Sequence, residues 1–511
     1  MKVAIQPLSG TARWGALLAL ILLVACAPTR PPEGVGRADI ASATAEARET
    51  RGASYPPSPM PPPDFTPNLD ERFEPVPTGE PRGNLQPANP AIRVIEADLS
   101  RIGDPDADSG MEAPDAPKIR YKDYAEVDDA IPTTSSCCPE PSVAENGQTI
   151  MMTGNVWMAL SEDGGTSFNS LNPTTVFPQD DGGLCCDQVV QYVPQIDMFI
   201  WLMQYRSKEG RNRIRIAAQT TNLVRSSNGT AWTYWDFTSN VFSDSGTLDY
   251  NDMSFGRSNL YWTSQINGRV VVRVPLSQIA AKSTINYGYT AGTDAKWSHV
   301  THNPTDTVYW AGHINNSQLR VYSMRDGDGF YSWRTVNINS WPNSSNSSIA
   351  PDGTDWMTFE LNKHYVYGNA RQGGNVWFGW LASKGGGFPH PHVQLVKIST
   401  SSFTLQDQVQ VWNPDFAFID PYLSTNAENE LGMAIAFGGG PFFASHAVGV
   451  WGDFVVYYPR LSTRATSRWG DYTTSRRSGS NSMEWVAAGY TNETDGSGTN
   501  VQIPHYIRFA R

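Results

Sequence analysis

Acidic residues, arginines and histidines recur in this sequence at the start of short hydrophobic segments or close to the turns that follow them. The candidate residues are Glu140, Asp187, Arg206, Asp252, His299, His313, His364, Asp420, Arg468 and Asp471. Carboxylates grouped with arginine and histidine could perform acid/base chemistry on a glycan, or could bind a polar ligand or a cation such as Ca²⁺. A structural role stays open as well, because Asp caps turns and polar residues line water-filled funnels.

Four of the five cysteines form two adjacent pairs, Cys137-Cys138 and Cys185-Cys186. Each pair lies just before one of the acidic residues above, so the two pairs occupy matching places in the chain. In an exported protein we expect disulfides, and two of the three possible pairings would join neighbouring repeats. A thiolate metal site is less favoured because no histidine lies beside either pair, and thiol redox catalysis is less favoured because a Cys-x-x-Cys spacing is absent.

The N-terminus has the features of a targeting segment. Two basic residues precede an apolar run at 15–25, which is short for a membrane span and is typical of a signal peptide. The run ends in LVAC at Cys26 and resembles the bacterial lipobox, in which the cysteine is lipidated and becomes the mature N-terminus. The resemblance implies an extracytoplasmic protein held by Cys26 at a bacterial membrane or cell surface. An ordinary signal peptide and a short anchor helix are the alternatives.

The sequence predicts three regions. Residues 1–26 form the signal peptide, residues 27–115 a disordered, Pro-rich tether, and residues 116–511 a folded domain. The tether contains the run PPSPMPPP at 56–63, which cannot enter a sheet or a helix interior.

The composition favours an all-β domain. The chain has 17 Trp, 21 Tyr and 20 Phe among many turn residues, which is typical of short strands. The formal net charge of −12 argues against a nucleic-acid partner.

A recurring unit indicates how the strands are arranged. Each unit has a polar or acidic group, a short strand, a turn and a more hydrophobic strand. The seven predicted copies begin near residues 140, 187, 252, 298, 347, 420 and 471. Spacings of roughly 45 to 75 residues leave room for four strands each, as in the blade of a β-propeller. We therefore predict seven blades, with six as the alternative, and a last blade completed by a strand from Ile119–Val127.

The stretch Ser161–Phe168, SEDGGTSF, resembles the Asp-box (BNR repeat) found on the blades of sialidase-like propellers. Degenerate versions of this turn occur at 226–232 and 326–329. The resemblance implies a sialidase-like propeller fold. The Phe/Tyr-Arg-Ile-Pro motif of true sialidases is absent, so sialidase activity is not expected.

In a propeller the innermost strands begin around a central funnel, where the candidate residues would gather. Our main hypothesis is a recognition protein that binds an extracellular polymer, such as a glycan, or a surface partner at this funnel. The alternative is a glycoside hydrolase or polysaccharide lyase that uses the same residues, so whether the protein is an enzyme stays open. A second alternative is an envelope scaffold that makes its contacts on the outer blade surfaces.

Overall fold

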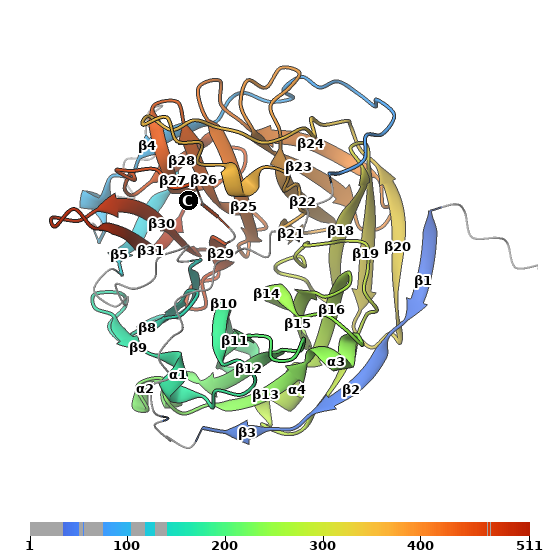
Figure 1. Ribbon diagram of the computed structural model, residues 1–511, viewed down its shortest axis with the longest axis vertical. Coiled ribbons are helices and arrows are strands. Elements are labelled where there is room, and N and C mark those ends of the chain that lie inside the picture. The colour runs from blue at the N-terminus through green and yellow to red at the C-terminus, as the bar shows by residue number, and fades with distance from the viewer. Residues whose placement is uncertain are drawn as a thin grey trace, which may run out of the picture.

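The computed structural model describes residues 34–50, 55, 75–103, 118–127, 140–467, 469–470 and 472–511. These residues form seven sheets arranged in a ring, as Figure 1 shows. The predicted seven-bladed β-propeller is therefore confirmed.

Blades 1 to 3 follow one another along the chain. Blade 1 contains β6 (Ser142–Asn146), β7 (Thr149–Thr153), β8 (Met158–Ser161) and β9 (Asn169–Leu171). Blade 2 contains β10 (Leu184–Val193), β11 (Met198–Tyr205), β12 (Arg213–Thr220) and β13 (Thr233–Thr238). Blade 3 contains β14 (Asp249–Phe255), β15 (Asn259–Gln265), β16 (Arg269–Pro275) and β17 (Ile285–Tyr289).

Blades 4 to 7 complete the ring. Blade 4 contains β18 (Thr307–Asn315), β19 (Gln318–Arg325) and β20 (Phe330–Asn337). Blade 5 contains β21 (Gly368–Gln372), β22 (Asn375–Ala382), β23 (His392–Ser399) and β24 (Leu405–Val411). Blade 6 contains β25 (Ala417–Thr425), β26 (Leu431–Gly439), β27 (Phe442–Val450) and β28 (Val455–Tyr458). Blade 7 contains β29 (Thr474–Arg477), β30 (Trp485–Thr494) and β31 (Asn500–Ala510).

The helices of the described residues are all short. They are η1 (Leu99–Arg101), α1 (Pro173–Val176), η3 (Pro194–Ile196), α2 (Thr221–Ser226), α3 (Ser239–Phe242), α4 (Leu276–Ala280) and η4 (Thr358–Glu360). None of these described helices has the length and apolar character that crossing a membrane would need.

The core lies between neighbouring blades. Strands in the middle of each sheet are buried on both faces, so they read as continuous hydrophobic runs. Large aromatic side chains fill the wedge between sheets. Trp201 on β11, Trp262 on β15, Trp310 on β18 and Trp485 on β30 are fully buried.

The ring closes through a strand that comes from the N-terminal side. β5 (Arg120–Glu126) pairs antiparallel with β31 and is the fourth strand of blade 7. This confirms the predicted closing strand at Ile119–Val127. The pairing protects the outer edge of β31 and ties residues near position 120 to the C-terminus of the chain.

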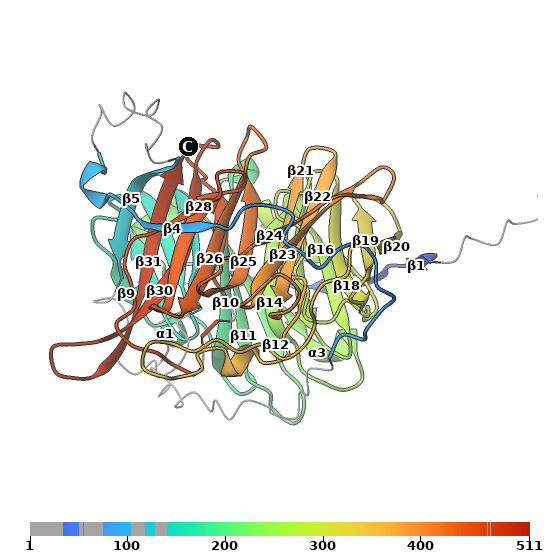
Figure 2. The same ribbon diagram turned by 90° about the horizontal axis from the view of Figure 1, so that it is seen from above.

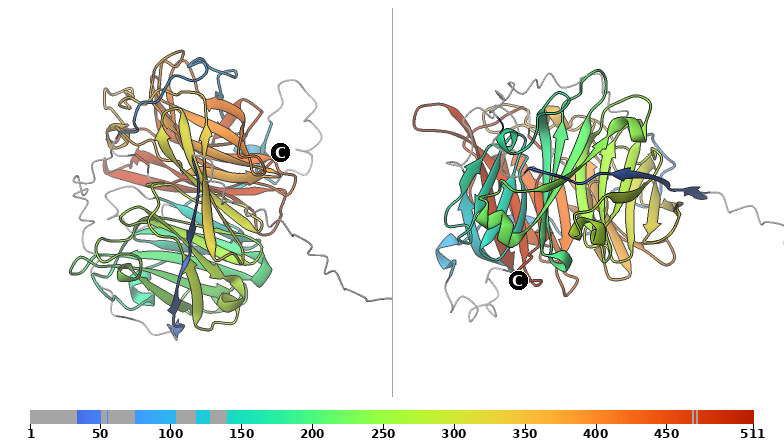
Figure 3. Two further views of the ribbon diagram at one scale, coloured as in Figure 1. Left: turned by 90° about the vertical axis from the view of Figure 1, so that its right-hand side faces the viewer. Right: turned by 90° about the horizontal axis from the view of Figure 1, so that it is seen from below.

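The N-terminal tether was expected to be disordered, and the structure corrects this for its described part. β1 (Val35–Asp39), β2 (Ala41–Ala45) and β3 (Arg48–Glu49) add to the outer edges of blades 4, 3 and 2. Figure 3 shows them as one dark-blue band across the rim of three blades. The segment lacks proline between residues 34 and 50 and is rich in small residues, so its backbone can pair with exposed edges.

A second N-terminal segment lies on blade 6. β4 (Arg93–Glu96) pairs parallel with β28, and the chain around it crosses the outer side of blades 5 and 6 (Figure 2). Asn89 holds this segment against β24 of blade 5, because its side chain donates to the carbonyl of Gln410 and accepts from the amide of the same residue. The described part of the predicted tether therefore belongs to the folded domain.

Two repeats differ from their predicted form. The predicted first strand of the fourth unit, at 298–301, is an irregular segment whose amides donate to Val366 and Tyr309. The predicted fifth unit at 347–359 is a loop, and blade 5 begins with β21 at Gly368 instead. The Ser/Asn-rich stretch 343–348 favours turns, whereas the hydrophobic run at 375–382 forms the buried strand β22.

The predicted turn at 161–168 connects β8 to β9, the third and fourth strands of blade 1. Asp163 accepts hydrogen bonds from the amide and the hydroxyl of Ser167, at 2.9 and 2.6 Å. Gly164 and Gly165 both have positive φ, and the ring of Phe168 packs against Tyr506 of blade 7. The related stretches 226–232 and 326–329 connect β12 to β13 in blade 2 and β19 to β20 in blade 4.

Candidate functional site

The innermost strands share an unusual backbone feature near their first residues. Glu140, Tyr250, Trp297 and Asp420 have positive φ although they carry side chains, and Gly470 has positive φ at the matching place in blade 7. The ladders of β10, β14 and β25 show register shifts near this point. Such bulges change the direction of the local side chains, and strained positions of this kind cluster at functional sites.

A buried polar cluster contains residues from blades 3, 4, 6 and 7. Asp252 Oδ2 is 3.2 Å from His302 Nε2 and 3.9 Å from His299 Nδ1. Arg476 lies on the far side of His302, with its Nη1 3.2 Å from His302 Nδ1. The Tyr422 hydroxyl is 3.1 Å from His299 Nδ1. Asp252 and His299 are 0% exposed, so neither of these two predicted residues lines an open funnel in this structure.

Three tyrosines extend this polar cluster. The Tyr472 hydroxyl donates to Asp187 Oδ2 at 2.6 Å, and the Tyr367 hydroxyl donates to Asp420 Oδ1 at 3.0 Å. The ring of Tyr250 stacks on those of both His299 and Tyr472. Buried carboxylates need such hydrogen-bond partners, so the tyrosines account for the burial of the acids.

Burial and charge set the protonation states of this cluster. The neighbouring His299, His302 and Arg476 hold the pKa of Asp252 well below its usual range despite its burial. Burial lowers the pKa of His299 to about 3, and it raises the pKa of Tyr472 well above its ordinary value. At neutral pH the cluster therefore contains a charged Asp252 and neutral His299 and Tyr472.

The cysteines of blade 2 bond to each other. Cys185 and Cys186 form a disulfide between adjacent residues at the start of β10, next to Asp187. The expected disulfide at these cysteines therefore follows the one of the three possible pairings that joins no two repeats, and Cys137 and Cys138 lie outside the described residues.

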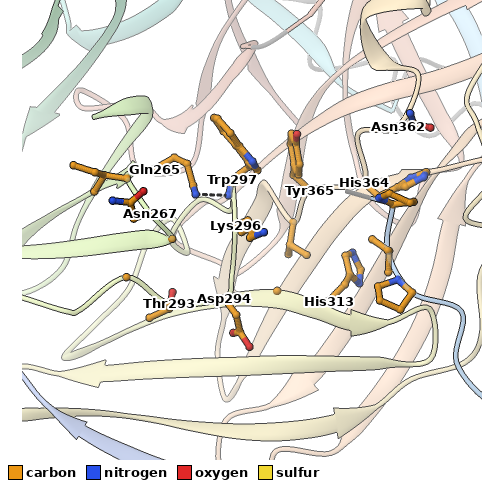
Figure 4. A pocket seen from close by; sticks show the side chains of 18 of the residues that line it. Gln265, Asn267, Thr293, Asp294, Lys296, Trp297, His313, Asn362, His364 and Tyr365 are labelled. Atoms are coloured by element: carbon orange, nitrogen blue, oxygen red, sulfur yellow. Dashed lines mark hydrogen bonds between the residues drawn. The ribbon is translucent and has the colours of Figure 1, made fainter. Parts of the chain in front are cut away.

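A cavity of about 930 Å³ opens on the same face as the starts of the inner strands. Blade 3 contributes the loop before β14 and the β15–β16 turn, and blade 4 contributes the segment 292–297 and the end of β18. The segment 362–366 before blade 5 and residues 75–77 of the N-terminal segment complete the wall. Figure 4 shows Gln265 and Asn267 on one side of this top-face cavity and His313 and His364 on the other. The predicted pair His313 and His364 is thus brought together by blades 4 and 5.

Aromatic rings form the middle of the cavity wall. Trp297 stacks on Tyr365, with ring centroids 5.7 Å apart and an interplanar angle of 29°. The Trp297 amide donates to Gln265 Oε1 at 3.0 Å, which fixes the strained backbone at this residue. Both rings are partly exposed, so a ligand in the cavity can contact them.

The two histidines are held in the neutral form. Burial lowers the pKa of His313 to about 3, and its ring packs between Trp341 and Trp380. His364 also has a lowered pKa because of burial, and its two ring nitrogens face the carbonyls of Leu381 and Ser344. A neutral ring carries one N–H, so His364 donates to one of these two carbonyls, and the contacts fix the orientation of its ring in the cavity wall.

The carboxylate that lines the top-face cavity among the described residues is Asp294. It pairs with Arg320 and accepts a hydrogen bond from the Tyr322 hydroxyl. A glycosidase of the usual kind needs two carboxylates that flank the scissile bond. The cavity therefore offers stacking and amide groups for binding, without a second carboxylate in the described part of its lining.

A different pair of carboxylates lies near the axis. Glu360 and Asp420 both approach Gly470, where an added Cβ would lie 3.3 Å from Glu360 Oε1 and 2.8 Å from Asp420 Oδ2. Lys363 Nζ is 3.0 Å from Glu360 Oε1. Sequence reasoning missed Glu360 because it lies at the end of η4, one residue after the predicted fifth unit at 347–359.

The remaining predicted residues are dispersed. Glu140 is buried at the start of blade 1, and Arg206 lies beside Gly182 in the loop after β11. Arg468 and Asp471 lie outside the described residues. Trp297 and Tyr365 were not predicted, although the first lies two residues before His299 and the second directly follows His364. The described residues contain no group of three or more His, Cys, Asp or Glu side chains suited to a metal ion.

Neither a protein-family profile nor a curated protein matches this chain. Solved structures align with low similarity. An α-L-arabinofuranosidase from Fusarium graminearum is 11% identical with a TM-score of 0.36, and the alignment covers 76% of this chain and 98% of that one. An α-L-arabinanase from Penicillium chrysogenum is 10% identical with a TM-score of 0.34, at 76% and 98% coverage. A protein of unknown function from Dyadobacter fermentans is 8% identical with a TM-score of 0.38, at 77% and 100% coverage. Similarity this low carries no argument about chemistry.

Proposed function

We propose that this protein is an extracytoplasmic, lipid-anchored propeller that binds a glycan in its top-face cavity. The stacked pair Trp297 and Tyr365 in the cavity wall carries the proposal. Sugar rings present apolar C–H faces that pack on aromatic rings, and their hydroxyls pair with amide side chains. Gln265, Asn267 and Asn362 supply such amides around the pair.

The size and charge of the cavity support this ligand class. A volume of about 930 Å³ lies within the range of small-molecule sites and has room for a short oligosaccharide. The neutral histidines add ring surface without adding charge. The lipid anchor at Cys26 is an inference from the sequence alone and would place the cavity outside the cytoplasm.

The test is a binding screen of purified protein against bacterial, algal and host polysaccharides, with and without a chelator. We expect saturable binding to at least one polymer, and Trp297→Ala should weaken it about ten-fold or more through loss of stacking. Trp451→Ala is the matched control, because this tryptophan is half-buried on the opposite face, after β27. Equal binding by both variants and the unmodified protein would exclude the top-face cavity as the site.

A second candidate function is glycan cleavage, and the pair Glu360 and Asp420 favours it. Two carboxylates from different blades that converge on one glycine could serve as acid and base. The same screen should then yield new reducing ends, or unsaturated-uronate absorbance for a lyase. Glu360→Gln should abolish turnover and leave binding at Trp297 intact. Binding without any product in the unmodified protein would leave recognition as the function.

A further inference from the structure

A second cavity, of about 500 Å³, lies on the opposite face of the ring. Its lining comes from the turns between the first and second strands of blades 2, 3, 5, 6 and 7, and from the loop at 303–305 in blade 4. We call it the bottom-face cavity. Because six blades contribute to it, the cavity surrounds the ring axis and has a rigid frame.

Three arginines line the bottom-face cavity. Arg257 follows β14, Arg371 lies on β21, and Arg477 ends β29, so blades 3, 5 and 7 each supply one guanidinium. The lining residues include no Asp and no Glu among the described part of the chain. Three positive charges in one concavity are notable in a chain of net charge −12.

The arginines are positioned by backbone contacts rather than by acids. Arg477 donates from Nε to the carbonyl of Thr425 and from Nη2 to that of Asn426, both at 2.8 Å. Arg371 donates from Nε to the carbonyl of Gly373 at 3.0 Å. Thr425 links the two, because its hydroxyl donates to the carbonyl of Arg371 at 3.0 Å.

No ion pair engages these three guanidiniums within the described residues. Burial lowers the pKa of Arg477, which is the expected cost of holding a charge away from water without a counter-ion. The nearby carboxylate of Glu145 is occupied elsewhere, because it accepts from the amide of Gly479 and from the hydroxyls of Ser478 and Ser480.

We propose that the bottom-face cavity binds a ligand that carries an oxyanion: a carboxylate, a sulfate or a phosphate group on a sugar-sized molecule. The planar guanidinium fork matches these groups in geometry and gives short, charge-assisted hydrogen bonds. The three arginines come from three blades and line the same cavity, so each has N–H groups to offer an oxyanion bound there. This site is on the opposite face from the proposed glycan site and does not depend on it.

The test is isothermal titration of the full chain with glucuronate, sulfate and phosphate in turn, at ionic strength held constant with chloride. We expect one saturable site for at least one anion, and the anion that binds identifies the ligand class. Arg257→Gln should weaken that binding about ten-fold or more, as the loss of a hydrogen bond to a charged group predicts. Arg257 is the first choice because its side chain makes no hydrogen bond within the described structure, so its removal spares the fold.

Two further variants sharpen the result. Arg371→Gln should weaken anion binding to a similar extent, whereas Arg334→Gln, an equal loss of charge on the exposed part of β20, should not. Trp297→Ala should leave anion binding unchanged, which separates this site from the top-face cavity. The proposal is overturned if none of the three anions gives saturable binding at tens of millimolar, or if Arg257→Gln and Arg371→Gln bind as Arg334→Gln does.

Discussion

The acidic residues near the axis were predicted to gather around a central funnel. The contacts of Asp252 indicate a structural role for this residue. Asp252 is surrounded by His299, His302 and Arg476 and has no exposed surface. Its charge is stabilised by cationic and polar neighbours, so its removal leaves those neighbours without their partner. Deleting one member of a buried charged group is far more costly than deleting an exposed one.

We expect Asp252→Asn to lower the free energy of unfolding by about 3 kcal/mol or more, because it leaves Arg476 and the histidines without the anion they surround. Urea denaturation followed by tryptophan fluorescence measures the change. Asp306→Asn is the control: its exposed pair with Arg325, at 3.5 Å, should contribute less than about 1 kcal/mol. An Asp252→Asn protein as stable as the control would contradict the structural role.

At the scale of elements, two N-terminal segments stabilise a ring whose blades come from later in the chain. β5 supplies the last strand of blade 7, and β1 to β3 cover the edges of three blades. These segments differ in what they protect. β5 closes the ring, whereas the band formed by β1 to β3 covers strands that already belong to complete sheets.

Deletion of residues 116–130 should destabilise the whole domain, because blade 7 would expose the edge of β31 and lose contacts between the first and last blades. We expect a thermal unfolding midpoint lower by several degrees, with a broader transition, in differential scanning calorimetry. An unchanged midpoint would show that the ring is closed without β5.

Removal of the band formed by β1 to β3 should affect self-association of the protein more than closure of the ring. A chain that begins at residue 75 exposes the outer edges of β13, β17 and β20, and free edges pair with other chains. We expect concentration-dependent self-association in analytical ultracentrifugation. The matched control begins at residue 34 and keeps the band, so it should stay monomeric under the same conditions. Identical sedimentation of the two chains would count against an edge-covering role.

At the scale of the whole molecule, buried neutral histidines link stability to pH. Burial lowers the pKa to about 3 in five histidines: His299, His313, His392, His446 and His505. The ordinary value near 6.5 returns on unfolding, so between about pH 6.5 and pH 3 the unfolded chain binds more protons than the folded chain. Stability is therefore complete above about pH 6.5 and is lost as the pH falls towards 3.

We expect the free energy of unfolding to fall by about 2 kcal/mol for each such histidine between pH 7 and pH 5. Urea titrations at several pH values measure this slope. The variant His392→Gln should have a shallower slope, because one proton-linked group is gone. A slope that is flat in this range, or equal in the variant, would mean that these histidines keep ordinary pKa values in the folded protein.

The sequence by itself determined the class of fold and much of its order. Turn residues at fixed offsets, as at Ser161–Phe168, and hydrophobic runs such as β11 and β26 are local features, so they predicted blades, their number and the closing strand. The fifth repeat was misplaced because a loop containing buried Trp356 has the composition of a strand.

Only the tertiary structure decided which residues share a site. Trp297 and Tyr365 are far apart in the chain and meet because blades 4 and 5 are neighbours. The band of β1 to β3 depends on edges that form only after three blades have folded. Burial separates Asp252 and His299 from the cavity-lining residues, and the sequence pattern of polar residues before strands is the same for both. Long-range packing decides which of these polar residues are buried and which line the cavity, because the local sequence pattern is the same for both.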